Sequence, residues 1–168
     1  MKPTAIVTFH TNQYTCGVAR FNIALAESLE VPLVSLNNFL SKPISGALLS
    51  IKCEEIGEEN SQELSQFLVS ANEKFDVYLH GLDHSEAEQI VITQAARIFT
   101  ATMEMADIIR KMRSDVQSTF APGANPSPIP KQVDCTLLTF GMAHKIRVAG
   151  YRKLGEILLH ESRTFRLE

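Results

Sequence analysis

The chain has 168 residues, of which 45% are hydrophobic and 21% charged, and its 16 basic and 19 acidic side chains give a net charge of −3. A chain of this size can bury one core, and its weak negative charge argues against a nucleic-acid or anionic-membrane partner. Three widely spaced cysteines exclude a disulfide framework and a clustered zinc motif. No apolar run approaches the roughly 20 residues that span a bilayer, and the apolar start is too short for a signal peptide. We therefore expect a cytoplasmic protein without a transmembrane segment.

The first predicted unit is a strand, a polar loop and a helix. Residues 5–9 are rich in β-branched side chains and almost wholly apolar, as in a buried parallel strand. Apolar residues then recur at helical spacing from Gly17 to Leu29. Gly17 has no Cβ, so a ligand can approach its backbone, and the unpaired N–H groups of the first helical turn suit a phosphate or carboxylate. The plainer alternative is a glycine that only begins a helix.

Strands and helices alternate through residue 120. Five more strands are expected at residues 31–36, 47–53, 75–79, 97–101 and 116–120, with a loop and one helical turn at 37–46 and helices after Asn60, Ser85 and Thr102. This alternation predicts an α/β fold in which helices cover both faces of a parallel sheet, a Rossmann-like, doubly wound, three-layer α/β/α arrangement. Ligands bind such sheets outside the carboxyl ends of the strands.

Two of these helices carry finer predictions. Asn60 and Glu63 have the spacing of a capping box, which predicts Asn60 as an N-cap. In the helix after Thr102, an apolar stripe is expected to pack in the core and not to bind metal; it comprises Met105, Ile108, Ile109 and Met112. A dense acidic group before Asn60 is read as solvated surface; it comprises Glu54, Glu55, Glu58 and Glu59.

A change of composition follows residue 120. Four of the seven prolines lie in residues 121–130, so no helix or central strand can pass through this stretch. We therefore divide the chain into a domain at residues 1–121, a linker at 122–131 and a strand-helix unit at 132–168. Net charge changes from −6 over residues 1–130 to +3 beyond them, which supports a boundary. One strand and one helix cannot enclose a core, so this appendage must pack on the first domain, pair with another chain, or begin a second domain.

Candidate site residues follow two strands. His80, Asp83 and His84 come directly after the strand at 75–79, where imidazole beside carboxylate can hydrogen-bond a sugar hydroxyl or move a proton. The alternatives are that Asp83 or Ser85 caps the next helix, or that His80, Asp83 and His84 bind a metal.

The loop after the first strand holds a second group. His10 and Asn12 precede Gly17 and are expected either to contact substrate or to face solvent. Cys16 adjoins the helix terminus, where a thiol pKa can fall, but no arrangement of a base and an orienting group marks it as a nucleophile, and we read it as a small residue in a tight turn.

The sequence also resembles the GT-B retaining glycosyltransferases. Residues 15–21, Thr-Cys-Gly-Val-Ala-Arg-Phe, are similar to that family's opening glycine loop and first helix. Ala-Arg-Ile-Phe-Thr-Ala-Thr-Met-Glu-Met at 96–105 resembles the strand and helix that end its N-terminal domain. Phe-Ala-Pro-Gly-Ala-Asn at 120–125 matches the turn between its domains, and Leu-Thr-Phe-Gly-Met-Ala-His-Lys at 138–145 resembles the start of its donor-binding domain.

This resemblance implies an acceptor-side, GT-B N-terminal-type domain that helps to transfer a sugar from a nucleotide-sugar donor to a glycan or other hydroxyl acceptor, as in polysaccharide biosynthesis. The resemblance implies no obligatory cofactor or metal. It implies that Cys16 and Gly17 lie near the donor diphosphate, with Gly141 and Lys145 on its phosphates. His80, and next His84 with Asp83, would lie near the transferred sugar. The family's later acidic motif is missing from these residues, so we expect weak or no donor binding and no turnover by this chain alone.

Two other functions stay open. One is a non-catalytic flavodoxin-like binding module that forms a homodimer through residues 132–168, with the proline-rich linker as a hinge. The other is a small phosphate-handling hydrolase, although the chain lacks a clear pairing of nucleophile and acid for it.

Overall fold

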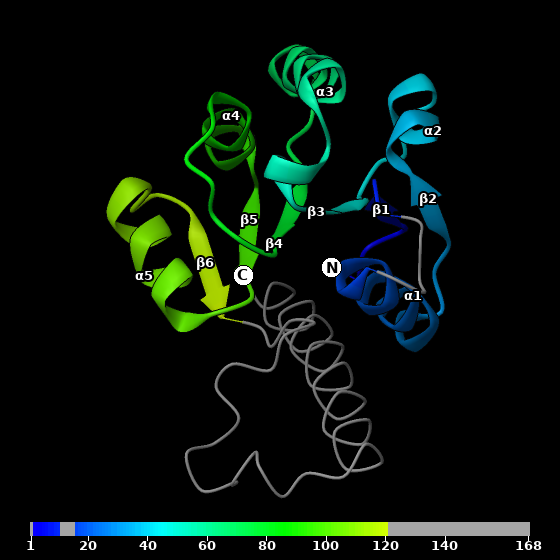
Figure 1. Ribbon diagram of the computed structural model, residues 1–168, viewed down its shortest axis with the longest axis horizontal. Coiled ribbons are helices and arrows are strands. Elements are labelled where there is room, and N and C mark those ends of the chain that lie inside the picture. The colour runs from blue at the N-terminus through cyan, green and yellow to red at the C-terminus, as the bar shows by residue number, and fades with distance from the viewer. Residues whose placement is uncertain (1, 11–15, 121–168) are drawn as a thin grey trace, which may run out of the picture.

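A six-stranded, all-parallel sheet forms the centre of the protein (Figure 1). The computed structural model describes residues 2–10 and 16–120. The strand order is β2-β1-β3-β4-β5-β6. The strands are β1 (Ile6–Thr8), β2 (Leu33–Ser35), β3 (Leu48–Ile51), β4 (Asp76–Leu79), β5 (Arg97–Thr100) and β6 (Gln117–Phe120).

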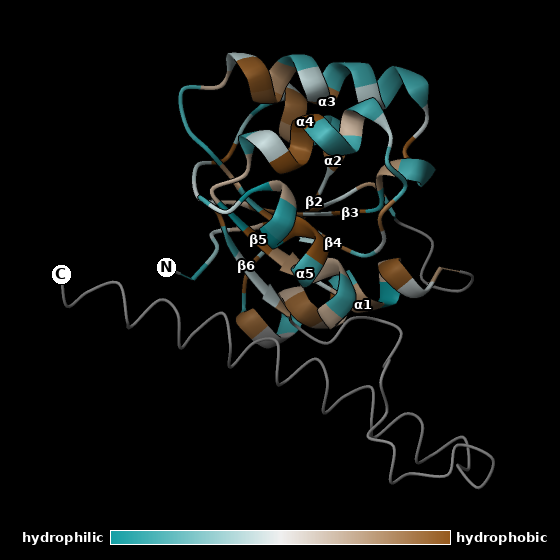
Figure 2. Ribbon diagram, turned by 90° about the vertical axis from the view of Figure 1, so that its left-hand side faces the viewer, coloured by the Kyte–Doolittle hydropathy of each residue, from teal (hydrophilic) through white to brown (hydrophobic). Residues whose placement is uncertain are grey.

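Helices cover both faces of this sheet. α1 and α5 lie on one side, and α2, α3 and α4 lie on the other (Figures 1 and 2). The helices are α1 (Gly17–Leu29), α2 (Leu36–Ser41), α3 (Glu58–Ser70), α4 (Glu86–Gln94) and α5 (Met103–Met112), with a 3-10 turn η1 (Cys53–Glu55) after β3. The predicted α/β fold with a parallel, doubly covered, Rossmann-like sheet is confirmed. The predicted linker at 122–131 and appendage at 132–168 lie outside the described residues.

The strand order locates the crevice of the sheet. β1 pairs with β2 on one side and with β3 on the other, and the chain adds all later strands beyond β3. The first five strands therefore follow the flavodoxin-like order, whose topological switch point lies between β1 and β3. Segments that leave the carboxyl ends of these two strands border that crevice.

The core consists of buried strand side chains and the inner faces of the helices. Every residue of β1 and β3 is buried, as expected for strands covered on both faces. On the α2–α3 side, Phe39, Phe67 and Phe75 form a cluster with ring centroids 5.2 to 5.7 Å apart. Edge-on aromatic pairs at this spacing add to the free energy of burial.

Several local predictions about α2 and α3 need correction. Residues 36–41 form a helix capped by Ser35, whose hydroxyl accepts a hydrogen bond from Asn38 N, where one turn was expected. The predicted Asn60 cap is wrong, because α3 begins at Glu58 after Gly57, whose φ of 80° favours glycine. Asn60 instead donates from Nδ2 to the Ile56 carbonyl at 2.7 Å, which satisfies the preceding turn.

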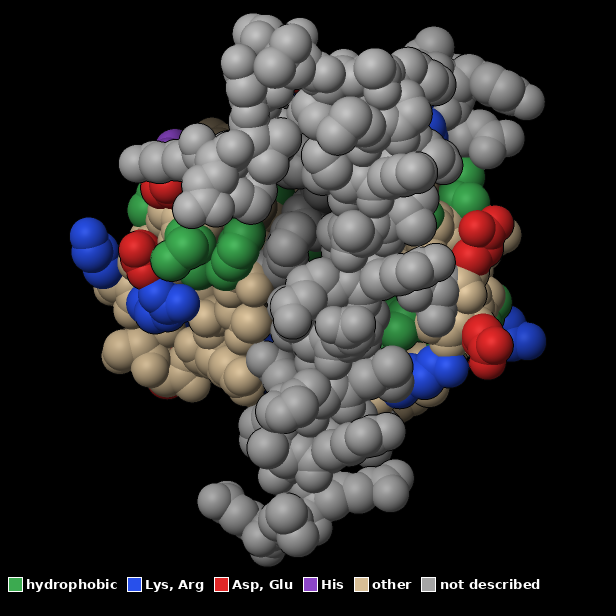
Figure 3. All heavy atoms as spheres, turned by 90° about the horizontal axis from the view of Figure 1, so that it is seen from below, with side chains coloured by type: hydrophobic (Ala, Val, Ile, Leu, Met, Phe, Trp, Pro, Cys, Tyr) green, Lys and Arg blue, Asp and Glu red, His purple; other side chains and the backbone are tan. Residues whose placement is uncertain are grey.

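The predicted apolar stripe on α5 is only half correct. Thr102 caps the helix through Met105 N, and Met105 and Ile109 are buried. Ile108 and Met112 are 39% and 49% exposed, because the helix turns Met105, Ala106 and Ile109 toward the sheet. Figure 3 views the side of the molecule that carries α1 and α5, and hydrophobic side chains reach the surface there beside charged ones.

Among the described residues, none of the helices combines the length and the apolar character that a membrane crossing requires.

Candidate functional site

A buried polar network joins β1, α1 and β3 at the carboxyl edge of the sheet. Asn22, on α1, donates from Nδ2 to Thr8 Oγ1 at 2.8 Å and to the Ser50 carbonyl at 3.1 Å. The Ser50 hydroxyl donates in return to Asn22 Oδ1. Thr8 Oγ1 also accepts from the His10 backbone N–H at 3.0 Å. Both amide protons of Asn22 are used, so the orientation of this side chain is fixed.

The network extends to His80, directly after β4. His80 Nε2 lies 3.0 Å from Ser50 Oγ. The single hydroxyl proton of Ser50 is directed to Asn22, so Ser50 can only accept from the ring, and Nε2 must carry the ring proton. The ring nitrogen Nδ1 then keeps its lone pair. Phe21 and Tyr78 hold the ring in place, with centroids 5.1 and 4.7 Å from that of His80.

His80 is neutral at physiological pH. Burial lowers the pKa of its imidazole to about 3, and the charges of His10 and Lys52 lower it further. A histidine with this pKa is a fixed hydrogen-bonding group and not a proton shuttle near pH 7.

A second polar group lies beside the network. The His10 side chain is 5% exposed, and its Nδ1 atom faces Glu55 Oε2 at 3.3 Å. Lys52 pairs with the other carboxylate oxygen of Glu55 and with Glu54. Burial lowers the pKa of His10, although the Glu55 charge opposes the shift. The segments after β1 and β3 therefore meet here, as their strand order requires.

The predicted catalytic residues Asp83 and His84 form the entrance to α4. Ser85 is the N-cap, and its hydroxyl accepts from Glu88 N at 3.1 Å, so that alternative is confirmed. Asp83 Oδ1 accepts from Ser85 N at 2.8 Å. Glu88 is 2% exposed and accepts from the N–H groups of Asp83 and His84 at 2.7 and 3.1 Å. The arrangement fixes His84 at a φ of 60°, with its side chain exposed.

The charges at this turn are set by burial and hydrogen bonds. Burial opposes ionisation of Asp83, yet the hydrogen bonds from Ser85 hold the pKa of its carboxyl below the usual value. Burial raises the pKa of Glu88. Burial also raises the pKa of Cys53 to about 12, helped by the charges of Asp83 and Glu88, so this thiol is not a nucleophile near neutral pH. The catalytic roles of Asp83 and His84 remain predictions.

Glu88→Gln should lower the free energy of unfolding by about 1–3 kcal/mol, because an amide can accept only one of the two N–H groups and turns its own donor toward the other. Urea-induced unfolding measures this change. Glu86→Gln, an exposed residue of the same first turn, is the matched control and should change stability by less than about 0.5 kcal/mol. Equal effects of the two substitutions would contradict the role of Glu88 as a buried cap.

The N-terminus of α1 is partly accessible at the same edge. Cys16 is the N-cap, its side chain makes no capping hydrogen bond, and no acidic residue lies in the first turn. Gly17 begins the helix and is partly exposed, as the prediction of an anion-binding turn requires. Asn12, Gly141 and Lys145 lie outside the described residues, so their predicted contacts stay predictions.

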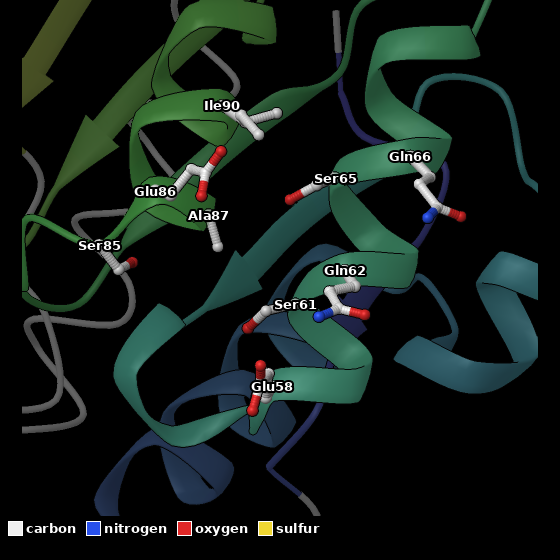
Figure 4. Close-up of a pocket in the computed structure, with 9 residues that line it drawn as sticks. All are labelled: Glu58, Ser61, Gln62, Ser65, Gln66, Ser85, Glu86, Ala87 and Ile90. Carbon is white, nitrogen blue, oxygen red and sulfur yellow. The ribbon is translucent and has the colours of Figure 1, made fainter.

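Two hollows lie on the opposite side of the sheet, among α2, α3 and α4. One has a volume of about 450 Å³ between α3 and α4; Gln62 lines it, and Ser61 and Ser65 extend from α3 to the side on which α4 lies (Figure 4). Glu58 and Glu86 line the same hollow, so it repels anions. The other has the same volume and lies between α2 and α3. Neither is lined by a residue of the Thr8–His80 network.

No family model, curated protein or solved structure matches the chain.

The sequence indicated His10, Cys16, Gly17 and His80, but it did not indicate their supporting residues. Asn22 lies on the buried side of α1, where an amide needs hydrogen-bond partners, and this was an available signal. Ser50 and Thr8 are polar residues within otherwise apolar strands, which is a similar signal. Glu55 was read as solvated surface, and its contact with His10 depends on the pairing of β1 with β3.

Proposed function

We propose that this chain is the acceptor-side part of a GT-B-type glycosyltransferase and that the crevice between β1 and β3 binds the nucleotide-sugar. The observation that carries the proposal is the neutral His80, held at the end of β4 by Ser50 and next to the switch point of the sheet. The implied reaction is transfer of a sugar from a nucleotide donor to a hydroxyl acceptor.

A neutral His80 is suited to hydrogen-bonding a sugar and not to transferring a proton. With Nε2 donating to Ser50, the lone pair on Nδ1 can accept a hydrogen bond from a sugar hydroxyl. A partly buried, hydrogen-bonded ring is also pre-organised, so little conformational entropy is lost when it binds the ligand. The role that we propose for His80 is therefore to orient the transferred sugar.

The first turn of α1 suits the diphosphate. Its N–H groups have no intrahelical partners and lie at the positive end of the helix dipole. No acidic side chain within that turn offsets this charge, and Cys16 does not occupy the N–H groups with a capping bond, although a carboxylate oxygen of Glu55 lies within 4.8 Å of the Cys16 sulfur and opposes an anion there. In this proposal Gly141 and Lys145 complete the donor site. Only the family resemblance supports their role.

Titration with a panel of sugar nucleotides, monitored by backbone amide NMR, tests the proposal. We expect weak binding, with shifts concentrated at residues 16–19 and 50–53, and about tenfold weaker binding by His80→Ala, since a hydrogen bond to a neutral group contributes about 1.5 kcal/mol at most. Gln62→Ala, in the hollow between α3 and α4, is the control and should bind normally. Shifts that lie outside residues 16–19 and 50–53, or loss of binding only in Gln62→Ala, contradict the proposal.

The strand order favours one further candidate, a flavodoxin-like binding module without catalysis. Order 2-1-3-4-5 is the arrangement in which flavodoxin-like proteins hold a ligand at the β1/β3 switch point. For this candidate we expect a concentration-dependent dimer in light scattering that disappears when the chain is cut after Pro130. A monomer at all concentrations argues against it.

A further inference from the structure

Three residues with metal-binding side chains meet at the crevice, from three separate segments. His10 follows β1, Cys16 is the N-cap of α1, and Glu55 ends η1 after β3. One ligand atom of each lies within 4.8 Å of the other two. Imidazole, thiolate and carboxylate are the three ligand types that zinc takes from proteins.

A second observation concerns the burial and the hydrogen bonds of the His10 side chain. Its side chain is 5% exposed, yet no group within residues 2–10 and 16–120 hydrogen-bonds the buried Nε2 atom. Its other nitrogen, Nδ1, lies 3.3 Å from Glu55 Oε2, beyond the 2.7–2.9 Å of a charge-assisted hydrogen bond. An ion between Nδ1 and Oε2 would join these two atoms, which lack a close hydrogen bond to each other, whereas Nε2 points away from Glu55 and stays outside the site.

The spacing of these atoms fits one shared ion. A tetrahedral zinc with bonds of about 2.0–2.2 Å to nitrogen and oxygen keeps those two ligand atoms roughly 3.4 Å apart, and a thiolate lies roughly 3.6 Å from both. Nδ1 of His10 and Oε2 of Glu55 already have this separation. One ligand atom each of His10 and Glu55 lies within 4.8 Å of Cys16 Sγ, so an approach of roughly 1.2 Å at most brings the sulfur to the separation that a shared ion requires.

The positive charge of Lys52 opposes the binding of a cation here, and its contacts predict the effect of removing that charge. Its ammonium group contacts Glu55 Oε1 at 2.6 Å and also pairs with Glu54. The oxygen Oε2 that faces His10 is not the one that Lys52 holds, so the carboxylate can bridge the two cations. Removal of the Lys52 charge should therefore strengthen metal binding.

We propose that His10, Cys16 and Glu55 bind one divalent zinc-type ion through Nδ1, Sγ and Oε2. Binding deprotonates the Cys16 thiol and releases that proton to solvent. Three protein ligands leave the fourth position of a tetrahedral ion open to water or to an oxygen of a ligand in the crevice. The site does not depend on the glycosyltransferase proposal, which requires no metal.

Equilibrium dialysis of the whole, untagged 168-residue chain against Zn²⁺ tests this site, with Co²⁺ as a spectroscopic probe. We expect one ion per chain and a thiolate-to-cobalt charge-transfer band. Cys16→Ser and Glu55→Gln should each weaken binding by at least about 100-fold, since even outer-shell changes cost about 10–100-fold. Lys52→Gln should tighten binding by roughly tenfold, because a like charge is removed.

Matched controls separate this site from other ligands and from misfolding. Glu54→Gln, Cys53→Ser and Cys135→Ser should each keep one ion per chain, since none removes a proposed ligand. Cys16→Ser should fold normally, because serine is a favourable N-cap residue, and circular dichroism without metal verifies this. A chain that binds no zinc, a cobalt complex without the thiolate band, or equal zinc binding by wild type, Cys16→Ser and Glu55→Gln would overturn the proposal.

Discussion

Replacement of Asn22 by leucine is expected to destabilise the protein by about 3–5 kcal/mol, since several buried polar groups lose a partner at once and each costs about 1–3 kcal/mol. Asn22 is fully buried, and its amide group bonds Thr8 Oγ1, the Ser50 carbonyl and the Ser50 hydroxyl. Leucine has a similar volume, so it fills the space without admitting water to replace the lost bonds. The free energy of urea-induced unfolding measures the effect.

A rescue experiment makes this expectation specific to the network. Adding Thr8→Val and Ser50→Ala to Asn22→Leu removes the side-chain partners that the leucine leaves unpaired, so the triple variant should regain part of the lost stability. Asn37→Leu, at an exposed position of α2, should change stability by less than about 0.5 kcal/mol. If the loss of stability in the triple variant equals the sum of the losses in the three single variants, these side chains act independently.

Stability should fall on acidification below about pH 6.5, and His80 should account for a measurable part of the slope. Burial lowers the pKa of His80 in the folded chain to about 3, whereas the unfolded chain keeps the ordinary value of 6.5. Between these pH values the unfolded state binds one more proton than the folded state. Each unit by which the pH falls therefore lowers the free energy of unfolding by up to about 1.4 kcal/mol. The stabilisation is complete above pH 6.5 and decreases as the pH falls toward 3; His10 acts in the same direction.

His80→Gln isolates this contribution. Glutamine can still donate to Ser50 but does not titrate, so the variant should lose less stability than wild type between pH 7 and pH 4.5. Carboxylates titrate equally in both proteins and cancel in the difference. Parallel stability curves for the two proteins would mean that His80 is protonated as easily in the folded state as in the unfolded state.

Much of the fold is readable from the sequence because its elements are locally determined. The helix over Gly17–Leu29 and the capping residues Ser85 and Thr102 follow from apolar spacing and from side chains within three residues. Most of the strands lie in short apolar runs, although β6 is Gln-Ser-Thr-Phe, and alternation with helices restricts them to a parallel sheet. These features need no knowledge of distant contacts.

The rest depends on contacts that local patterns do not contain. The Asn60 cap failed because Gly57 can adopt a positive φ and starts α3 earlier. Whether Ile108 is buried depends on how α5 lies on the sheet, and 39% of this residue is exposed. The bonds of Asn22 to Thr8 and Ser50 require β1 and β3 to be neighbours, which only the strand order reveals. The supporting residues of the site were therefore missed, although several of its direct candidates were found.

Nitrogen-15 NMR of the histidine side chains tests the central claim most directly, which is that the sheet edge holds His80 as a neutral ring donating from Nε2. The account predicts an Nε2–H tautomer whose shifts stay constant from pH 8 to about pH 5, well above its pKa of about 3. An Nδ1–H tautomer, or protonation of His80 with a midpoint near pH 6.5, would contradict the account.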